Sequence, residues 1–407
     1  MDNSHESNPN WRRLQLIWSL FALALFYVTL PLWVSTNEFP VVPLLAPLAS
    51  TVFQSAWIDG ALLGSLLVLI FINSIRSHSR LWLSIVILLS IMFLLNQHRL
   101  QPWAFHLFLG STVFACCSRE SGVRLLKWLS ISIYIYSAVG KLDYQFMHTV
   151  GLQFLETVLA WTGLTTDDLP VATAPKLTLI FPAFELLVAS FLLFRKTRVL
   201  GVYAAIFLHS LIILILSPLG LDHKPGVLIW NGLFIAMIPY LFLPMIQSVN
   251  ETKKTFTNRM ASLVIMAACL LPILESFGKY DHWLAWGLYS PRNSRAQINI
   301  HLYKVGEIKE LEPYMRPQLG DTPFRSLDLR KWSLEELNVP LYPQDRFQLA
   351  VARHIAHRYN LDSGIEVHLL GIANRFTGQR DVEILRGKHE IDMRCQQFFF
   401  STKSIAD

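Results

Sequence analysis

The sequence has little charge for its length. Of its 407 residues, 16% are Asp, Glu, Lys or Arg and 53% are hydrophobic, whereas soluble domains carry about 25% charged residues. The shortage lies in residues 14–275, which are mostly long apolar runs, while residues 276–407 have 18 basic and 16 acidic residues. This shift excludes a protein that is soluble throughout. It predicts a polytopic α-helical membrane bundle over residues 1–276 and a soluble domain over residues 277–407.

Cysteines and the common catalytic motifs are also scarce. Cysteines occur only at Cys116, Cys117, Cys269 and Cys395, and the last alone lies in the C-terminal domain. A disulfide within that domain is therefore excluded, and the absence of CxxC gives no support to a redox pair or a zinc knuckle. The GxGxxG, P-loop, HExxH and GxSxG patterns are absent as well.

The features of metal and nucleic-acid binding are missing too. His354 and His357 are three residues apart but have no Cys, Asp or Glu at partner spacing, so we expect solvated side chains and no metal site. The sequence pI is near 9.1, yet the basic residues stand in short clusters between apolar runs, where they orient helices. They form no basic face interleaved with aromatic residues, so no nucleic-acid partner is expected.

Long apolar runs are what the sequence does contain. A membrane-spanning helix needs about 20 mostly apolar residues, and about nine runs qualify as predicted spans. They cover residues 14–34, 57–75, 81–96, 102–118, 124–140, 174–194, 199–217, 226–244 and 258–276. The first run has no small-residue cleavage site and is expected to be a retained span.

Basic residues give these spans an orientation. With a cytoplasmic N-terminus, 13 basic residues fall in cytoplasmic segments and four in outside connections. Such a bias is typical of correctly counted spans. It predicts an integral plasma (inner) membrane protein with a cytoplasmic N-terminus and an extracytoplasmic C-terminal domain. We expect the outside segment 141–173 to hold an interfacial or re-entrant helix, and the outside loop 35–56 to pack on the outer membrane surface.

The C-terminal domain is predicted to be an α+β module with about four strands. Strands are expected at residues 297–303, 365–371, 381–386 and 393–399. Residues 333–337 predict a short helix with Ser333 as its N-cap. Residues 344–359 predict an amphipathic helix with Phe347, Val351, Ile355 and Tyr359 in its apolar stripe.

Polar residues within the predicted spans, or in the outside segments directly next to them, gather in the half of the membrane away from the cytoplasm. They are His98, Arg99, Gln101, His106, Lys141, Asp143, Glu185, His209, Trp230 and Asn231. Ionisable residues at membrane depth are costly and suggest a functional cavity. Non-functional alternatives remain open for these residues. Lys141 could extend to the headgroups, and Glu185 and His209 could pair with each other or with backbone as structural glue. His98 and Arg99 could be loop residues that meet lipid phosphate, and Trp103 could belong to an interfacial aromatic belt.

Two segments resemble a known family. The run IYSAVGKLDYQFMHTVG at residues 135–151 and the turn NQHRLQPWAFH at residues 96–106 resemble the HTTM superfamily, which includes vitamin K-dependent gamma-carboxylase. They are also similar to DoxX/MauE-like bacterial membrane proteins. The resemblance covers residues 80–240. It implies that Lys141 acts as a base toward a quinone-type lipid cofactor, with His98 or His106 as the matching histidine.

Two function classes follow. In the first, the chain is an oxidoreductase-like or carboxylase-like enzyme acting on a quinol or other lipid-soluble substrate, with Lys141 as base, Asp143 orienting it and His98 or His106 as partner. Its cofactor site would be lined by Gln101, Trp103, Glu185, His209 and Asn231. In the second, the bundle is a non-enzymatic membrane anchor or maturation factor that presents its C-terminal domain to an extracytoplasmic protein partner. A transporter is less favoured, because the cytoplasmic half lacks comparable polar residues.

Overall fold

The computed structural model describes residues 9–35, 39–49, 56–243, 256–318 and 320–404. Lys253 and Lys254, part of the last predicted cytoplasmic cluster, lie outside the described residues, as do parts of the predicted loop 35–56. The chain divides into two compact units. The bundle unit contains residues 1–28, 65–89 and 102–291, and the sheet unit contains residues 29–64, 90–101 and 292–407.

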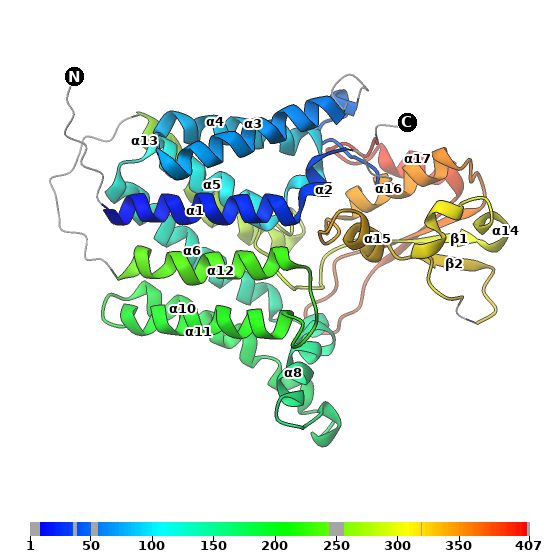
Figure 1. Cartoon of the computed structure of the whole chain (residues 1–407). Coiled ribbons are helices and arrows are strands. Elements are labelled where there is room, and N and C mark those ends of the chain that lie inside the picture. Colours follow the sequence, from blue (N-terminus) through cyan, green and yellow to red (C-terminus); the bar gives the residue numbers. More distant parts are fainter. Residues whose placement is uncertain (1–8, 36–38, 50–55, 244–255, 319, 405–407) are drawn as a thin grey trace. The chain divides into compact units, whose positions relative to one another are not determined.

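Helices occupy all of the predicted spans. They are α1 (Pro9–Val28), α3 (Ala56–Ile75), α4 (Ser79–Leu95), α5 (Pro102–Cys116), α6 (Arg119–Lys141), α9 with α10 (Ala174–Leu177 and Ile180–Leu193), α11 (Arg198–Leu216), α12 (Pro225–Phe242) and α13 (Phe256–Leu270) (Figure 1). Within the described residues, five helical segments are long and apolar enough to cross a membrane: residues 56–75, 174–193, 198–216, 225–242 and 256–277. These helices are compatible with an integral membrane protein. A typical span has about 20 residues, whereas α4 has 17 and α5 has 15. Helix length alone therefore does not establish the predicted number of about nine spans.

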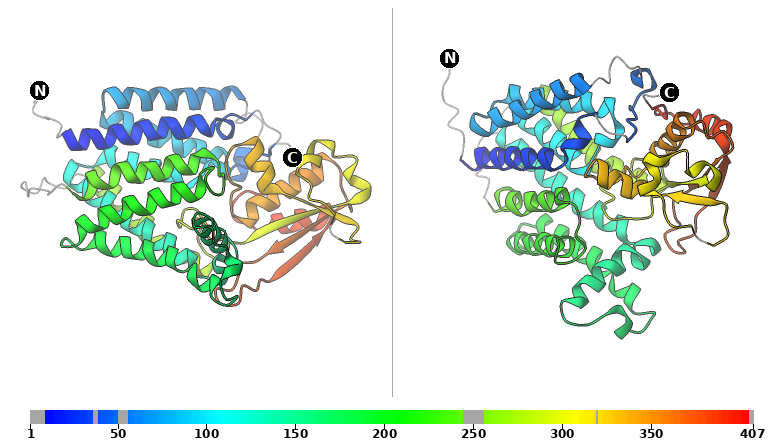
Figure 2. Two further views of the ribbon diagram at one scale, coloured as in Figure 1. Left: turned by 60° about the horizontal axis from the view of Figure 1, so that its bottom comes forward. Right: turned by 45° about the vertical axis from the view of Figure 1, so that its right-hand side comes forward.

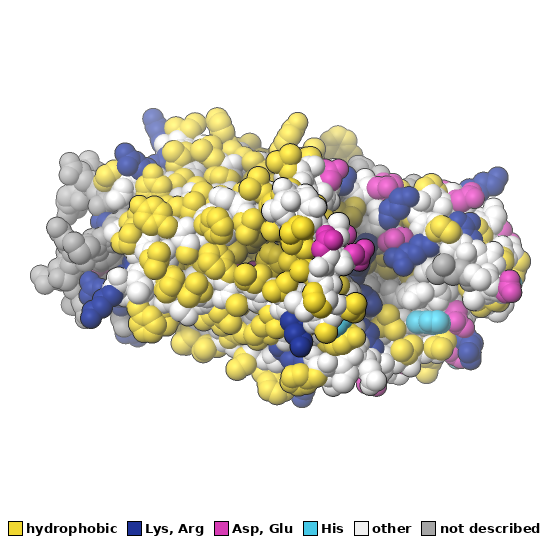
Figure 3. All heavy atoms as spheres, turned by 90° about the horizontal axis from the view of Figure 1, so that it is seen from below, with side chains coloured by type: hydrophobic (Ala, Val, Ile, Leu, Met, Phe, Trp, Pro, Cys, Tyr) yellow, Lys and Arg dark blue, Asp and Glu magenta, His cyan; other side chains and the backbone are white. Residues whose placement is uncertain are grey.

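The helices of the bundle unit pack side by side. Helix α6 packs against α10, α10 against α11, α11 against α12 and α12 against α1 (Figure 2). The face of the unit that Figure 3 shows is largely hydrophobic. On α11, Val199, Tyr203 and Phe207 are exposed at intervals of four residues, so they form one apolar stripe. An exposed apolar surface of this extent suits contact with lipid.

Two of the predicted segments are subdivided. The first predicted span breaks after α1, and α2 (Leu30–Trp33) follows, because Pro31 has no N–H with which to continue the helix. Segment 141–173 contains α7 (Tyr144–His148), α8 (Val150–Ala160) and the 3₁₀ turn η4 (Thr166–Asp168). A helix is thus present there as α8, and Phe154 packs it against Ile215 and Leu216 of α11. Its interfacial or re-entrant placement stays a prediction.

The sheet unit contains an antiparallel four-stranded sheet in the order β2-β1-β3-β4. The strands are β1 (Arg295–His301), β2 (Phe324–Leu327), β3 (Ile365–Leu370) and β4 (Val382–Arg386), and Ile298 of β1 pairs with Leu327 and Val367. Helix α16 (Asp345–Arg358) packs on β1 and β3, and α17 (Gly387–Cys395) packs on β3 and β4. Phe347 and Val351 of α16 are fully buried with Ile298 and Val367. The α+β architecture with four strands is therefore confirmed.

Three predictions for this module were wrong in detail. Residues 393–399 do not form a strand: α17 ends at Cys395, and Ile391 and Cys395 are buried at helical spacing. Strand β2 was not predicted, because four residues are too few to show alternation. The helix expected at Ser333 begins four residues earlier as α15 (Leu329–Glu336), since Asp328 accepts hydrogen bonds from the backbone N–H groups of the first turn.

Two segments from the N-terminal part of the chain, residues 29–64 and 90–101, belong to the sheet unit. The backbone N–H of Ser401 donates to the carbonyl oxygen of Leu44 at 3.1 Å, and the Phe39 ring lies 4.6 Å from the Trp332 ring. The described part of loop 35–56 therefore contacts the C-terminal module. The domain boundary predicted between residues 276 and 277 stays a prediction. In the structure, the last segment of the bundle unit ends at Pro291, and the last segment of the sheet unit begins at Arg292.

Candidate functional site

Lys141 and Glu185 form a buried ion pair in the bundle unit. Lys141 is the last residue of α6, and its Nζ lies 2.8 and 2.9 Å from the two carboxylate oxygens of Glu185 in α10. The hydroxyl of Ser137, four residues earlier and therefore on the same face of α6, accepts from Nζ at 2.7 Å. The two charged side chains are 4% and 7% exposed. A buried charge is tolerated only when it is paired and hydrogen-bonded, and both conditions hold here.

A second polar chain connects α6, α11 and α12. The hydroxyl of Tyr134 lies 2.7 Å from Nε2 of His209, and Nδ1 of His209 lies 2.7 Å from Oδ1 of Asn231. The amide nitrogen of Asn231 donates to the carbonyl of Val227, so its oxygen faces His209 and must accept from Nδ1–H. Nε2 then accepts from the Tyr134 hydroxyl. The imidazole is neutral in this arrangement.

Aromatic rings bring His106 to the same region. The Phe234 ring stacks on His209 with centroids 4.7 Å apart and on His106 with centroids 5.3 Å apart. The indole N–H of Trp230 donates to Nδ1 of His106 at 3.3 Å. We call Lys141, Glu185, Tyr134, His209, Asn231 and His106 the bundle cluster. It brings together residues from α5, α6, α10, α11 and α12.

Several expected partners lie elsewhere in the structure. Asp143 caps α7 by accepting from the backbone N–H of Phe146 at 2.9 Å, and the carboxylate that binds Lys141 is Glu185. Glu185 and His209 do not pair with each other. Glu185 binds Lys141, whereas His209 binds Tyr134 and Asn231. Trp103 is buried, with its ring 5.1 Å from that of Phe26. Ser137 and Tyr134 were missed from the sequence, although they precede Lys141 by four and seven residues on one helix face.

His98 and Gln101 belong to the sheet unit. His98 is fully buried, and burial lowers its pKa to about 4 despite the opposing effect of its hydrogen bond to Pro340. The ring is therefore neutral near pH 7, and Nε2–H donates to the carbonyl oxygen of Pro340 at 3.0 Å. Gln101 donates to the carbonyl of His98. Of the two histidine candidates, His106 is the one in the same unit as Lys141.

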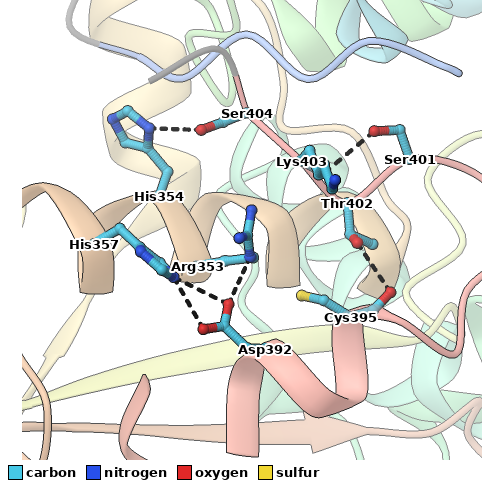
Figure 4. Close-up of polar contacts among 9 residues, drawn as sticks. All are labelled: Arg353, His354, His357, Asp392, Cys395, Ser401, Thr402, Lys403 and Ser404. Carbon is cyan, nitrogen blue, oxygen red and sulfur yellow. Dashed lines mark hydrogen bonds and ion pairs between the residues drawn. The ribbon is translucent and has the colours of Figure 1, made fainter. Parts of the chain in front are cut away.

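The histidines of α16 have partners rather than solvated side chains (Figure 4). His354 is buried with Nδ1 2.7 Å from the hydroxyl of Ser404, and Nε2 of His357 lies 3.0 Å from Asp392. Arg353 donates to the same carboxylate at 2.6 Å. The prediction of solvated histidines was wrong because Asp392 lies 35 residues from His357, a separation that helical spacing does not reveal. Among the described residues, no group of three or more His, Cys, Asp or Glu could hold a metal ion.

Opposing effects act on Asp392. Burial raises the pKa of its carboxyl group, but the hydrogen bonds and positive charges of His357 and Arg353 outweigh this and lower it overall. Asp392 is therefore ionised near pH 7, and it connects α17 to α16.

No family model, curated protein or solved structure matches this chain. The resemblance to the HTTM superfamily therefore stays a prediction from the two sequence segments at residues 96–106 and 135–151.

Proposed function

We propose that this chain is an HTTM-like integral membrane enzyme in which the Lys141–Glu185 pair performs acid–base chemistry on a quinol or another lipid-soluble substrate. The observation that carries the proposal is the burial of both charges, 4% and 7% exposed, at the end of α6 and within α10. An ionisable residue within a membrane-spanning segment indicates function by default, because lipid cannot solvate its charge.

The geometry suggests how Lys141 would act as a base. A base needs a free lone pair, whereas Nζ of Lys141 directs its hydrogens to Glu185 and Ser137. Transfer of one proton from Nζ to the Glu185 carboxylate leaves a neutral amine beside a neutral acid, which suits a low-dielectric site. The amine can then accept the hydroxyl proton of a quinol, giving a quinolate anion and an ammonium group. Tyr134 and His209 supply hydrogen-bonding groups nearby.

We also propose the full topology: nine spans, a cytoplasmic N-terminus and an extracytoplasmic C-terminal module in a bacterial inner membrane. Contacts within the sheet unit support it. Leu44 and Gln97 both hydrogen-bond to Ser401, so these three positions lie on the same side of the membrane. The chain must then cross an even number of times between residues 44 and 97 and again between residues 97 and 401. The two and six predicted spans there meet this condition.

Reporter fusions test the topology. A phosphatase that is active only outside the cytoplasm, fused after residue 407, is expected to be active, and the same reporter inserted after Ser77 is expected to be inactive. Activity at Ser77 or inactivity at the C-terminus would overturn the proposed orientation.

The acid–base role is tested with the full chain in lipid nanodiscs and a short-chain naphthohydroquinone. Wild type is expected to accelerate quinone formation in the presence of dioxygen, because the quinolate is oxidised faster than the neutral quinol. Lys141→Met is expected to abolish this acceleration. Lys176→Met is the control, since Lys176 is exposed in α9 and lies on the same predicted side. Acceleration by wild type and Lys141→Met alike would remove Lys141 from the mechanism.

A double variant separates chemistry from folding. Lys141→Met with Glu185→Leu replaces the pair by apolar side chains and leaves no unpaired charge, and such replacements are often tolerated. We expect this variant to fold like wild type and to be inactive. A folded and fully active double variant would show that the pair is structural.

The alternative role as an anchor or maturation factor is supported by the edge of the sheet. Strand β4 is at one end of the strand order, and its Val382 and Ile384 are exposed. Exposed edge strands can pair with an extended segment of a partner protein. In this case the intact chain should retain a stable partner on affinity purification, Ile384→Lys should release it, and Lys141→Met should have no effect.

A further inference from the structure

A basic pocket lies at the end of the bundle unit where α6 and α11 begin and α10 and α12 end. Its volume is about 420 Å³. The lining contains four cationic side chains and an apolar wall: Arg124, Lys127, Arg195 and Arg198, with Trp128, Ile131, Leu192, Leu193, Val199, Phe242 and Leu243. We call this the basic pocket. Lys127 precedes Lys141 by 14 residues in α6, which separates the pocket from the bundle cluster by about 21 Å along the helix.

Lys127 and Arg198 both make cation–π contacts with one buried aromatic ring. Nζ of Lys127 lies 5.7 Å from the centroid of the Phe242 ring, and the guanidinium carbon of Arg198 lies 6.0 Å from it. Nε of Arg198 also donates to the carbonyl oxygen of Leu192 at 3.4 Å. Lys127 and Arg198 are thus half-buried in the interior of the pocket, while Arg124 and Arg195 are exposed at its rim.

The cations have no counter-charge from the described chain. The lining contains no Asp or Glu, and within the residues that the structure describes none of the four forms an ion pair. Four positive charges around one cavity repel one another, and partial burial strengthens the repulsion. An anion with several acceptor oxygens would relieve it, and Arg side chains match phosphate oxygens well.

The apolar wall narrows the choice of anion. Trp128, Leu193, Val199 and Leu243 are exposed beside the cations, on helices with the hydrophobic outer surface seen in Figure 3, where Lys and Arg side chains gather at the end of the bundle. A small soluble anion would leave this apolar wall uncovered, whereas the acyl chains of a lipid would cover it. We propose that the basic pocket binds the phosphate headgroup of an anionic membrane lipid. Clusters of basic residues between membrane helices are suited to such headgroups.

The test uses the purified full chain in a neutral detergent and measures binding of dihexanoyl phosphatidylglycerol by native mass spectrometry. Dihexanoyl phosphatidylcholine has the same chains without net charge and is expected to bind more weakly. Lys127→Gln with Arg198→Gln is expected to weaken phosphatidylglycerol binding by roughly thirtyfold, equivalent to about 2 kcal/mol for two cations.

The matched control is Arg76→Gln with Arg80→Gln. It also removes two charges from a predicted cytoplasmic segment, and both residues are exposed and outside the pocket. It is expected to bind phosphatidylglycerol like wild type. An equal loss in both double variants would show a general surface attraction and overturn the site.

Two further arms complete the test. If the Lys127 and Arg198 variant does not fold, Arg124→Gln with Arg195→Gln at the exposed rim decides: weakened binding supports the pocket, and unchanged binding overturns it. Glycerol phosphate and inorganic phosphate separate a lipid from a soluble ligand. Binding of either as tightly as phosphatidylglycerol would overturn the lipid assignment, and weaker binding supports it.

Discussion

The imidazole of His209 and the side-chain amide of Asn231 join α11 to α12 through a hydrogen bond of 2.7 Å. The two residues are 22 positions apart and both are buried. Because Asn231 also donates to the carbonyl of Val227, its orientation fixes which ring nitrogen of His209 carries the proton. The tautomer in turn leaves Nε2 free to accept from Tyr134.

This relationship predicts a specific cost of truncation. Asn231→Leu leaves the buried Nδ1–H of His209 without its acceptor, which costs about 1–3 kcal/mol. Thermal unfolding of the purified chain in detergent should therefore show a lower midpoint than wild type. The triple variant Tyr134→Phe, His209→Phe and Asn231→Leu removes all three partners, including the Tyr134 hydroxyl that would otherwise lose its acceptor, and should recover most of the loss. A triple variant less stable than Asn231→Leu alone would contradict the hydrogen-bonding assignment.

The Lys141–Glu185 pair predicts a larger loss of stability, whichever of the two residues is replaced. Glu185→Leu leaves the Lys141 ammonium buried without a carboxylate, and removing one partner of a buried pair costs about 3–5 kcal/mol. Lys141→Met likewise leaves the Glu185 carboxylate buried without its cation. A double-mutant cycle measured by denaturant unfolding should give a strong favourable coupling, with the double variant more stable than either single variant. Additive effects would show that the two charges do not interact.

The positions of the helices could be predicted from the sequence because each apolar run is much longer than a soluble strand. All of the expected spans contain helices. What failed were short-range assignments in the C-terminal module. The residues QQFF at 396–399 resemble the end of a strand, but Ile391 and Cys395 bury one face of α17, and tertiary packing overrides local preference there.

The site could be predicted only as a set of residue types. Burial of charge in an apolar run identified Lys141 and Glu185 separately, but 44 residues separate them, and sequence spacing cannot pair residues on different helices. His98 illustrates the reverse problem. It lies eight residues from His106 in sequence, yet it bonds to Pro340 in the sheet unit. Contacts of this kind depend on how the loops fold back, which periodicity does not report.

Asp392 predicts a dependence of stability on pH. Its folded-state pKa is lowered by His357 and Arg353, whereas an unfolded Asp has a pKa of about 3.9. The carboxylate therefore stabilises the fold fully above that unfolded value, and this contribution is lost as the pH falls through the lower folded value. Tryptophan fluorescence of the full chain should show denaturant resistance falling below about pH 4. Asp392→Asn should show a smaller decrease over the same range, and an identical decrease would exclude Asp392 as a cause.

The close packing of α10 against α11 predicts a sensitive position at Gly201. A Cβ there would lie 2.8 Å from the backbone nitrogen of Leu192 and 2.9 Å from the carbonyl carbon of Phe191. These are backbone atoms and cannot rotate away, so Gly201→Ala must separate the two helices and is expected to cost about 1–3 kcal/mol. Gly64→Ala in α3 is the control, because nothing lies within 4 Å of its added Cβ, and Ala favours a helix over Gly by up to about 1 kcal/mol. Thermal unfolding should therefore move in opposite directions in the two variants. A wild-type midpoint in Gly201→Ala would mean that α10 and α11 do not approach as closely as this, and the basic pocket formed at their junction would lose its geometric basis.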